Sequence, residues 1–200
     1  MGYSFPSIYD CLMSPFEKTI LKNIRRDLVG QAIGNVLEIG SGSGVNFSYY
    51  RREKVVGVRA IEPNRLMQER ALKKVRSSLV PIRMYMGDAE ELPFPDNSFD
   101  SVIATLVFCT IPDPIKAIKE IQRVAKPNAK IFLFEHVKMD HQLLSRLQDW
   151  LTPLWKKICD GCSLNRPTLN LVRESGLTLT RVETYYKSFL ITIEALNAKG

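Results

Sequence analysis

The nonapeptide Val36-Leu37-Glu38-Ile39-Gly40-Ser41-Gly42-Ser43-Gly44 changes in character halfway along. Its first half is an apolar run typical of a buried strand, and its alternating glycines are typical of a tight loop beside a nucleotide. The glycine spacing differs from the G-x-G-x-x-G fingerprint of dinucleotide-binding loops. Glu38 also places a carboxylate where it would disfavour a pyrophosphate and favour an ammonium group, directly or through water. The alternative for Glu38 is a carboxylate satisfied by nearby backbone N–H groups.

The composition is that of an ordinary globular domain. The chain has 200 residues, 45% of them hydrophobic and 24% charged, so we expect a single domain over residues 1–200. No apolar run approaches the ~20 residues of a membrane-spanning helix, and the stretch MGYSFPSIYD lacks a signal peptide's basic and apolar regions. We therefore expect a cytoplasmic protein. The net charge of +7 is compatible with peripheral contact with an anionic membrane, but basic residues scattered along helix faces favour solvated surfaces.

Strands and helices alternate along most of the chain. The predicted strands are 36–39, 55–61, 82–86, 101–108 and 130–135, and the predicted helices are 14–29, 45–52, 64–77, 114–125 and 142–158. Two further strands, 177–185 and 189–196, follow at the C-terminus, joined by a short turn. This order predicts an α/β fold with a Rossmann-like, doubly wound, mostly parallel sheet and an antiparallel C-terminal edge.

Four successive strand ends carry groups suited to a nucleotide-like ligand, which such sheets bind at the carboxyl ends of their strands. The glycine loop ends the first strand. Glu62 ends the second, about 20 residues later, where an acid accepts hydrogen bonds from ribose hydroxyls. Asp88-Ala89 follows the third strand, where the carboxylate could accept from an adenine amino group. Thr105-Leu106 ends the fourth and would line the cleft. Each signal is weak singly, but together they predict one site.

This pattern resembles the class I S-adenosylmethionine-dependent methyltransferases, especially the group that contains quinone and phospholipid methyltransferases. The nonapeptide is similar to their first motif, AIEPN (60–64) to their second, and GDAEELPFPDNSFDSVIA (87–104) to their adenine loop and following strand. The stretch RVAKPNAKIFLFEH (123–136) resembles a helix–turn–strand that usually reads R-x-L-K/R-P-G-G. Here Asn128-Ala129 replaces the two glycines, and asparagine tolerates the positive φ of such a turn.

A narrower resemblance covers the C-terminal third. Phe134-Glu135-His136-Val137, the tryptophan-bearing segment 150–155 and the stretch DGCSLNR (160–166) are similar to a methyltransferase-like family whose mammalian members methylate alkyl thiols. Those mammalian proteins carry a hydrophobic N-terminal anchor, which this sequence does not show. Ser7-Ile8-Tyr9-Asp10 instead resembles the Y-D element of bacterial lipid and quinone methyltransferases, which folds over the cofactor.

The resemblance implies S-adenosylmethionine as the cofactor and S-adenosylhomocysteine as the product. The implied cofactor-binding residues are Tyr9, Glu38, Gly40, Ser41, Gly42, Glu62, Pro63, Asn64, Asp88, Ala89, Thr105 and Leu106. A general base matters only for an acceptor that is protonated at neutral pH, such as a thiol of pKa near 8.5. His136 is the leading candidate for this base. An equally weighted alternative is that His136 is only hydrogen-bonded within the strand end. Tyr9 and Asp160 are weaker candidates.

We expect an N-terminal helical cap (1–30) and a helical lid (140–170) to form the acceptor pocket. The acceptor expected is a small lipophilic molecule, with thiols and phospholipid amines ahead of quinone precursors. An apolar stripe at helical spacing supports a pocket, although such stripes are more often packed core; it comprises Leu147, Trp150, Leu151, Leu154, Trp155 and Ile158.

Two other functions compete with this hypothesis. A nucleic-acid methyltransferase is suggested by the charge, but the N/D-P-P-Y/F motif of amino-methylating members is missing after the fourth strand, where residues 106–110 read LVFCT. No nucleic acid is therefore expected as a partner. An NAD-binding oxidoreductase is disfavoured by Glu38 and the glycine spacing. The hypothesis of a non-catalytic nucleotide-binding protein remains as an alternative.

Of the four cysteines, only Cys159 and Cys162 have motif spacing, and no second pair completes a four-thiolate zinc site. The pair also lies too late in the chain for a thioredoxin-like motif. We therefore expect neither a metal nor a redox centre. Asp160-Gly161 is better explained as a turn in which Gly161 supplies a positive φ where the preceding helix stops.

Overall fold

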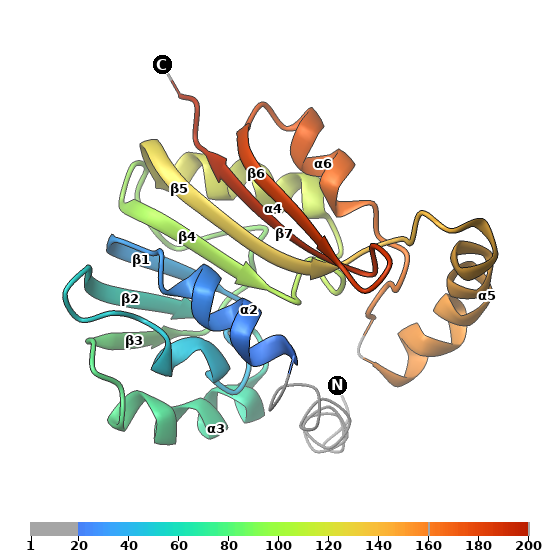
Figure 1. Cartoon of the computed structure of the whole chain (residues 1–200). Helices are drawn as coiled ribbons and strands as arrows, with labels where there is room; N and C mark the ends of the chain where they lie inside the picture. The colour runs from blue at the N-terminus through green and yellow to red at the C-terminus, as the bar shows by residue number, and fades with distance from the viewer. Residues whose placement is uncertain (1–19, 160, 200) are drawn as a thin grey trace.

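The computed structural model describes residues 20–159 and 161–199, which form a seven-stranded sheet between helices (Figure 1). Its strands are β1 (Gly34–Ile39), β2 (Val55–Ile61), β3 (Ile82–Tyr85), β4 (Phe99–Thr105), β5 (Ala125–His136), β6 (Thr178–Tyr185) and β7 (Leu190–Leu196). The order across the sheet is β3-β2-β1-β4-β5-β7-β6. Strands β1 to β5 pair in parallel, and β7 is antiparallel to both β5 and β6. The predicted doubly wound α/β sheet with an antiparallel edge pair is confirmed.

The helices match the sequence pattern with two exceptions. They are α2 (Ile20–Val29), the 3₁₀ turn η1 (Val45–Ser48), α3 (Arg65–Arg76), α4 (Pro114–Val124), α5 (Gln142–Ile158) and α6 (Thr168–Glu174). The helix expected at 45–52 is only the η1 turn, because this segment is rich in β-branched, aromatic and short polar residues that form helices poorly. The short helix α6 was not expected. The predicted helix start at Ser14-Pro15 lies outside the described residues.

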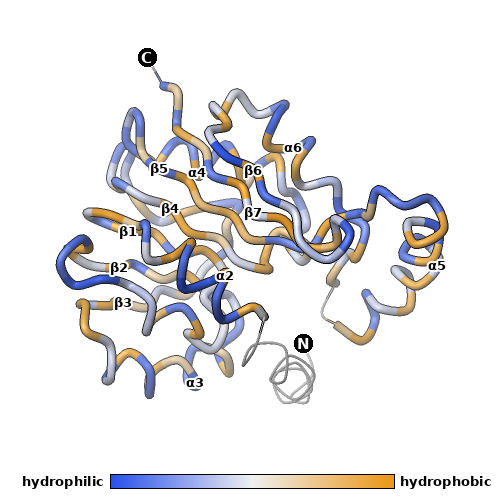
Figure 2. The backbone as a smooth tube through the Cα atoms, in the orientation of Figure 1, coloured by the Kyte–Doolittle hydropathy of each residue, from blue (hydrophilic) through white to orange (hydrophobic). Residues whose placement is uncertain are grey.

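The alternation of side chains along the strands divides the core into two layers. On β1, Val36 faces one layer while Leu37 and Ile39 face the other, because successive strand residues point to opposite faces. One layer packs against α2, η1 and α3, and the other against α4 and α6 (Figure 1). The apolar strands stand out in the hydropathy colouring of Figure 2. Within the described residues, no helix is both long and apolar enough to span a bilayer.

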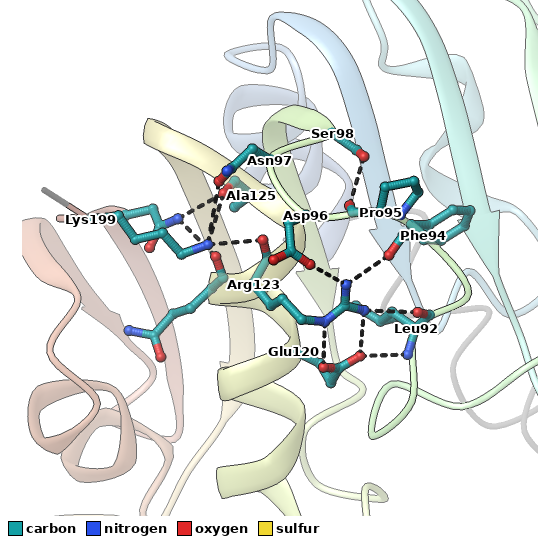
Figure 3. Close-up of polar contacts among 12 residues, drawn as sticks. Leu92, Phe94, Pro95, Asp96, Asn97, Ser98, Glu120, Arg123, Ala125 and Lys199 are labelled. Carbon is teal, nitrogen blue, oxygen red and sulfur yellow. Dashed lines mark hydrogen bonds and ion pairs between the residues drawn. The ribbon is translucent and has the colours of Figure 1, made fainter.

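One arginine fixes the loop that leads from the end of β3 into β4 (Figure 3). Arg123 on α4 pairs with Glu120 and with Asp96, each at 2.7 Å, and its guanidinium also donates to the carbonyls of Phe94 (2.8 Å) and Leu92 (3.0 Å). Glu120 in turn accepts from the backbone N–H of Leu92 at 2.8 Å. Such charge-assisted, planar contacts hold a loop geometrically as well as energetically. The loop that begins at Asp88 is thereby fastened to α4.

Candidate active site

A cavity of about 1000 Å³ opens at the carboxyl ends of β1, β2 and β4. Ten of the twelve predicted cofactor-binding residues line it: Gly40, Ser41, Gly42, Glu62, Pro63, Asn64, Asp88, Ala89, Thr105 and Leu106. Of the other two, Glu38 lies beneath the lining and Tyr9 lies outside the described residues. The position agrees with the general rule that open parallel sheets bind ligands beyond the carboxyl ends of their strands.

The glycine loop is built from left-handed backbone conformations. Gly40, Gly42 and Gly44 have φ of 61°, 53° and 72°, a region that residues with a Cβ seldom adopt. A Cβ on Gly40 would lie 2.1 Å from Val107 Cγ2, whereas one on Gly42 would meet nothing within 4 Å. Gly40 is therefore required by the close approach of the loop after β4, while Gly42 leaves space beside the cavity.

Glu62 closes the glycine loop from the neighbouring strand. Its Oε2 accepts from the backbone N–H of Gly42 at 2.8 Å, and its Oε1 accepts from the N–H of Asn64 at 2.9 Å. The side chain is only 7% exposed yet lines the cavity. A carboxylate accepts hydrogen bonds, so Glu62 places acceptor oxygens on the cavity wall.

Asn64 has a structural task besides lining the cavity. It is the N-cap of α3, where its Oδ1 accepts from the N–H groups of Leu66 (3.0 Å) and Met67 (3.3 Å). Caps of this kind satisfy N–H groups that the first helical turn leaves unpaired. After the neighbouring strand β3, Asp88 is exposed and Ala89 is buried in the loop that Arg123 fastens. Asn64, Asp88 and Ala89 all line the same cavity.

A buried polar network lies under the cavity floor and contains Glu38. Glu38 is 1% exposed and accepts from Tyr50 Oη at 2.6 Å and from Asn46 Nδ2 at 3.0 Å. Asn46 also donates to Thr105 Oγ1 (2.9 Å), which accepts from Arg25 Nη1 as well (2.5 Å). Burial raises the pKa of Glu38 from 4.5 to about 7, although the two hydrogen bonds and Arg25 act in the opposite direction. Side-chain donors therefore satisfy Glu38, and its predicted contact with a ligand ammonium group stays a prediction.

The loop after β4 is held by a second buried carboxylate. Glu135 is fully buried, and its Oε1 accepts from the N–H groups of Val107 (2.9 Å) and Phe108 (3.0 Å). Burial raises its pKa from 4.5 to about 7 against the effect of those N–H groups. Leu106 adopts a φ of 53° just before this contact. The strain is accommodated because Glu135 and the sheet fix the backbone on both sides.

His136 is not among the residues that line the cavity. Its Nε2 lies 3.2 Å from Cys162 Sγ, and its ring stacks on Phe189 with the centroids 5.8 Å apart. A hydrogen bond from Cys109 and the neighbouring His136 lower the pKa of the Cys162 thiol to about 5 although burial opposes this. The role of His136 as a general base stays a prediction, and the other two candidates, Tyr9 and Asp160, lie outside the described residues. Gly161 has a φ of 83°, which confirms the predicted turn after α5.

Helix α5 buries two polar side chains and exposes several apolar ones. Its buried residues are Gln148 and Thr152. Gln148 Nε2 donates to the carbonyls of Val137 and Leu164, each at 3.1 Å, and so fastens the helix beyond the end of β5 (Figure 1). The exposed stripe, which we call the α5 stripe, consists of Leu143 (69% exposed), Leu147 (49%), Trp150 (76%), Leu154 (60%) and Ile158 (50%). The expected helix is thus present and leaves apolar side chains exposed. Because none of its residues lines the cavity, its role as a lid stays a prediction.

Comparison with known proteins shows the family. A family model described as a methyltransferase domain matches residues 37–133. Human thiol S-methyltransferase TMT1B is 30% identical over 169 residues, which make up 78% of this chain and 68% of the human protein. The chain belongs to the S-adenosylmethionine-dependent methyltransferases. The phosphatidylethanolamine N-methyltransferase of Cereibacter sphaeroides is 32% identical over 117 residues, 58% of this chain and 57% of that protein.

The family's fold is also found in solved structures. The YcgJ protein of Bacillus subtilis is similar with a TM-score of 0.69 at 18% identity, and the match covers 90% of this chain and 98% of that one. The chain spans 62% to 68% of the length of the rat, human and mouse TMT1B proteins. The acceptors of those whole proteins are therefore carried over to this chain only as a proposal.

The cavity fits the cofactor of this family. Within the part of the chain that the structure describes, Ser41 Oγ is buried without a hydrogen-bond partner at the cavity wall, which is an uncommon state that a bound polar ligand would relieve. Glu62 and the open space at Gly42 supply an acceptor and room on the same wall. The volume lies at the upper end of the ~300–1000 Å³ typical of small-molecule sites.

Three residues of this site were missed from the sequence. Arg25 and Asn46 reach the cavity floor from α2 and η1, and Glu135 reaches the loop after β4 from β5. Arg25 lies in a predicted helix with other basic residues, so nothing marks it as the one that turns inward. Glu135 had a signal, because a carboxylate ending an apolar strand run must find donors when buried.

Proposed function

We propose that this methyltransferase transfers the methyl group of S-adenosylmethionine to a small lipophilic acceptor, with alkyl thiols ahead of phospholipid amines. The observation that carries the proposal is the contact of Glu62 with the Gly42 N–H on a cavity wall, together with an exposed apolar helix beyond the same sheet edge. When bound, the cofactor supplies a methyl group bonded to a sulfonium sulfur, and the neutral thioether is a good leaving group when an acceptor displaces it. The protein's part is to bind, orient and exclude water.

The cavity residues divide the binding task by chemistry. Glu62 accepts hydrogen bonds from the ribose hydroxyls, because it presents a carboxylate on the cavity wall. Asp88 and the Ala89 N–H take the adenine edge, with Pro63 packed beside the base. Ser41 and the glycine loop meet the amino-acid end of the cofactor. Glu38 stabilises the ammonium group of that end through Asn46 and Thr105 rather than by direct contact, because these two side chains lie between it and the cavity.

The same wall is unsuited to a dinucleotide. A pyrophosphate is normally held by loop N–H groups at the N-terminus of a regular helix. Here the Gly42 N–H already donates to Glu62, and the loop leads into a four-residue 3₁₀ turn instead of a helix. A carboxylate in that position repels phosphate. This supports the methyltransferase cofactor over NAD.

The ranking of acceptor classes follows from the exposed side chains of α5 and from the names of the similar proteins. The α5 stripe offers apolar surface, and burying an apolar acceptor there gains roughly 25 cal/mol per Å². Thiols come first because the chain matches proteins named thiol S-methyltransferase, and amines second because it matches one named phosphatidylethanolamine N-methyltransferase. We assign no proton transfer to His136, whose Nε2 is engaged with Cys162. A thiol near its pKa needs only modest assistance.

The test has two stages. Calorimetry should show binding of S-adenosylhomocysteine and none of NADH. Labelled cofactor should then transfer its methyl group to members of a panel that contains alkyl thiols, phosphatidylethanolamine vesicles, quinone precursors and structured RNA. We expect transfer to thiols or to vesicles. Transfer to RNA alone, or NADH binding without S-adenosylhomocysteine binding, would overturn the proposal.

A further inference from the structure

Two cysteines and a histidine from three separate segments meet in the interior. Cys109 lies in the loop after β4, His136 ends β5, and Cys162 lies in the turn after α5. Their ligand atoms all lie within 4.8 Å of one another, and His136 Nε2 is 3.2 Å from Cys162 Sγ. Cys109 is 3% exposed and Cys162 is 9% exposed. None of the three lines the cofactor cavity, so the proposed methyl transfer does not use them.

From this geometry we propose that Cys109, His136 and Cys162 form a binding site for a zinc(II) ion. In a tetrahedral zinc site with Zn–S bonds of about 2.3 Å and Zn–N bonds of about 2.0 Å, a sulfur and a nitrogen ligand lie about 3.5 Å apart and two sulfurs about 3.8 Å apart. The three atoms already approach that spacing, so small rotations of the side chains would admit the ion. Two soft thiolates with an imidazole favour zinc over magnesium or calcium.

Charge balance also favours the ion in this buried place. Two thiolates and a neutral imidazole carry a charge of −2, which a zinc(II) ion neutralises, and an uncompensated thiolate in the interior is costly. The three protein ligands leave a fourth position, which is filled by a non-protein ligand such as water. Cys159 is buried nearby but does not belong to the group of close ligand atoms.

The surrounding backbone holds the three ligands in place. The Ser163 N–H donates to the Cys109 carbonyl at 2.9 Å, and Arg166 Nη2 donates to the same carbonyl at 3.3 Å. The ring of His136 is oriented by Phe189. Preorganised backbone of this kind distinguishes a built site from side chains that meet by chance.

The ion would connect the segment after α5 to the wall of the cofactor cavity. Thr110 and Gly161, which follow Cys109 and precede Cys162 in the chain, both line the cavity. Zinc would therefore fix the turn after α5 against the ends of β4 and β5. This replaces our expectation of a metal-free protein. The sequence spacing did not suggest it, because the ligands come from three segments and only one of them belongs to the C-x-x-C pair.

Metal analysis of the full chain tests the proposal without any assay of methyl transfer. The protein, purified without added metal under reducing conditions, should contain one zinc per chain by mass spectrometry, or take up one when incubated with zinc chloride. Cys162→Ser and Cys109→Ser should lose it. Cys159→Ser is the matched control, since it removes a buried cysteine of the same motif and should retain the zinc. A chelator should lower the melting temperature of wild type and Cys159→Ser but not of Cys162→Ser.

Cobalt substitution covers the case in which the serine variants fail to fold. Unmutated protein loaded with cobalt(II) chloride should show thiolate-to-cobalt charge-transfer absorption and the strong visible bands of tetrahedral cobalt. Folded wild-type protein that takes up neither metal would overturn the proposal, as would a Cys109–Cys162 disulfide under these reducing conditions or zinc retained in Cys162→Ser. Each result is independent of whether the chain methylates a thiol, an amine or nothing.

Discussion

At the scale of single residues, the glycine loop shows that neighbouring glycines are needed for different reasons. Gly40→Ala places a Cβ 2.1 Å from Val107 Cγ2 and keeps a φ of 61°, whereas Gly42→Ala has only an unfavourable φ of 53°. We expect Gly42→Ala to lower the free energy of unfolding by about 1 kcal/mol and Gly40→Ala by about 2–4 kcal/mol, because overpacking adds to the backbone strain. Urea unfolding of both variants measures the difference. Equal losses would show that the close approach of Val107 is not maintained.

Glu62 provides the sharpest test of the cofactor's orientation. Glu62→Ala should weaken S-adenosylhomocysteine binding by about 1.5–3 kcal/mol, the range for hydrogen bonds to a charged group. Because the change also frees the N–H groups of Gly42 and Asn64, Glu62→Gln should be measured alongside it and should lose less. Glu53→Ala, an exposed change in the loop before β2, is the control for charge. Calorimetric affinity that is unchanged in folded Glu62→Ala would show that the ribose binds elsewhere.

At the scale of elements, the sequence predicts what depends on local periodicity and misses what depends on tertiary contacts. Strand β2 was predicted with its observed ends, because a hydrophobic run is bounded there by charged and turn residues. The positive φ predicted at Asn128 is confirmed at 60°. The residue lies within β5, at an irregularity in its pairing with β4, and not in a turn before the strand. The helix predicted at 45–52 was wrong, since periodicity alone did not weigh the poor helix formers of η1. Periodicity on α5 gave the helix correctly but could not tell that several of its apolar side chains are exposed.

The α5 stripe leads to a prediction about the acceptor and about membranes. We expect the double change Trp150→Ser and Leu154→Ser to alter the free energy of unfolding by no more than about 1 kcal/mol, because both side chains are exposed. The same variant should have a raised KM for an apolar acceptor and weaker binding to vesicles of anionic lipid, with which the chain's positive charge is compatible. Ile115→Ser on α4, at a site 56% exposed, is the matched control. A KM and vesicle binding equal to those of the control would remove α5 from the acceptor site.

At the scale of the whole molecule, the site is assembled from groups that are far apart in the sequence. Residues at the ends of β1, β2 and β4 could be predicted because the parallel sheet brings strand ends together in a known way. The buried polar network under the cavity floor could not be predicted. Arg25 reaches Thr105 from 80 residues away, and helical spacing does not say which basic residue turns inward. Buried charges in such a network affect the stability of the entire fold, and this makes the network measurable.

The pH dependence of stability should report the burial of Glu38. Its pKa is raised from 4.5 to about 7 in the folded protein, so between these values the folded state binds more protons than the unfolded state. The free energy of unfolding therefore falls as the pH rises through that window, and the full loss, about 3 kcal/mol for a shift of this size, is reached above pH 7. In the variant Glu38→Gln the side chain cannot ionise, so its free energy of unfolding does not show this loss.

We therefore expect the variant to gain stability relative to wild type as the pH rises from about 4.5 to 7.5, in urea unfolding at closely spaced pH values. Glu135 titrates over a similar range in both proteins, so its contribution cancels in the difference between them. The hydrogen bonds made by Tyr50 and Asn46 persist in part, because an amide offers one acceptor and one donor in place of two acceptors. A difference that stays constant across the range would mean that Glu38 ionises in the folded protein as readily as in water, and that the network compensates its burial fully.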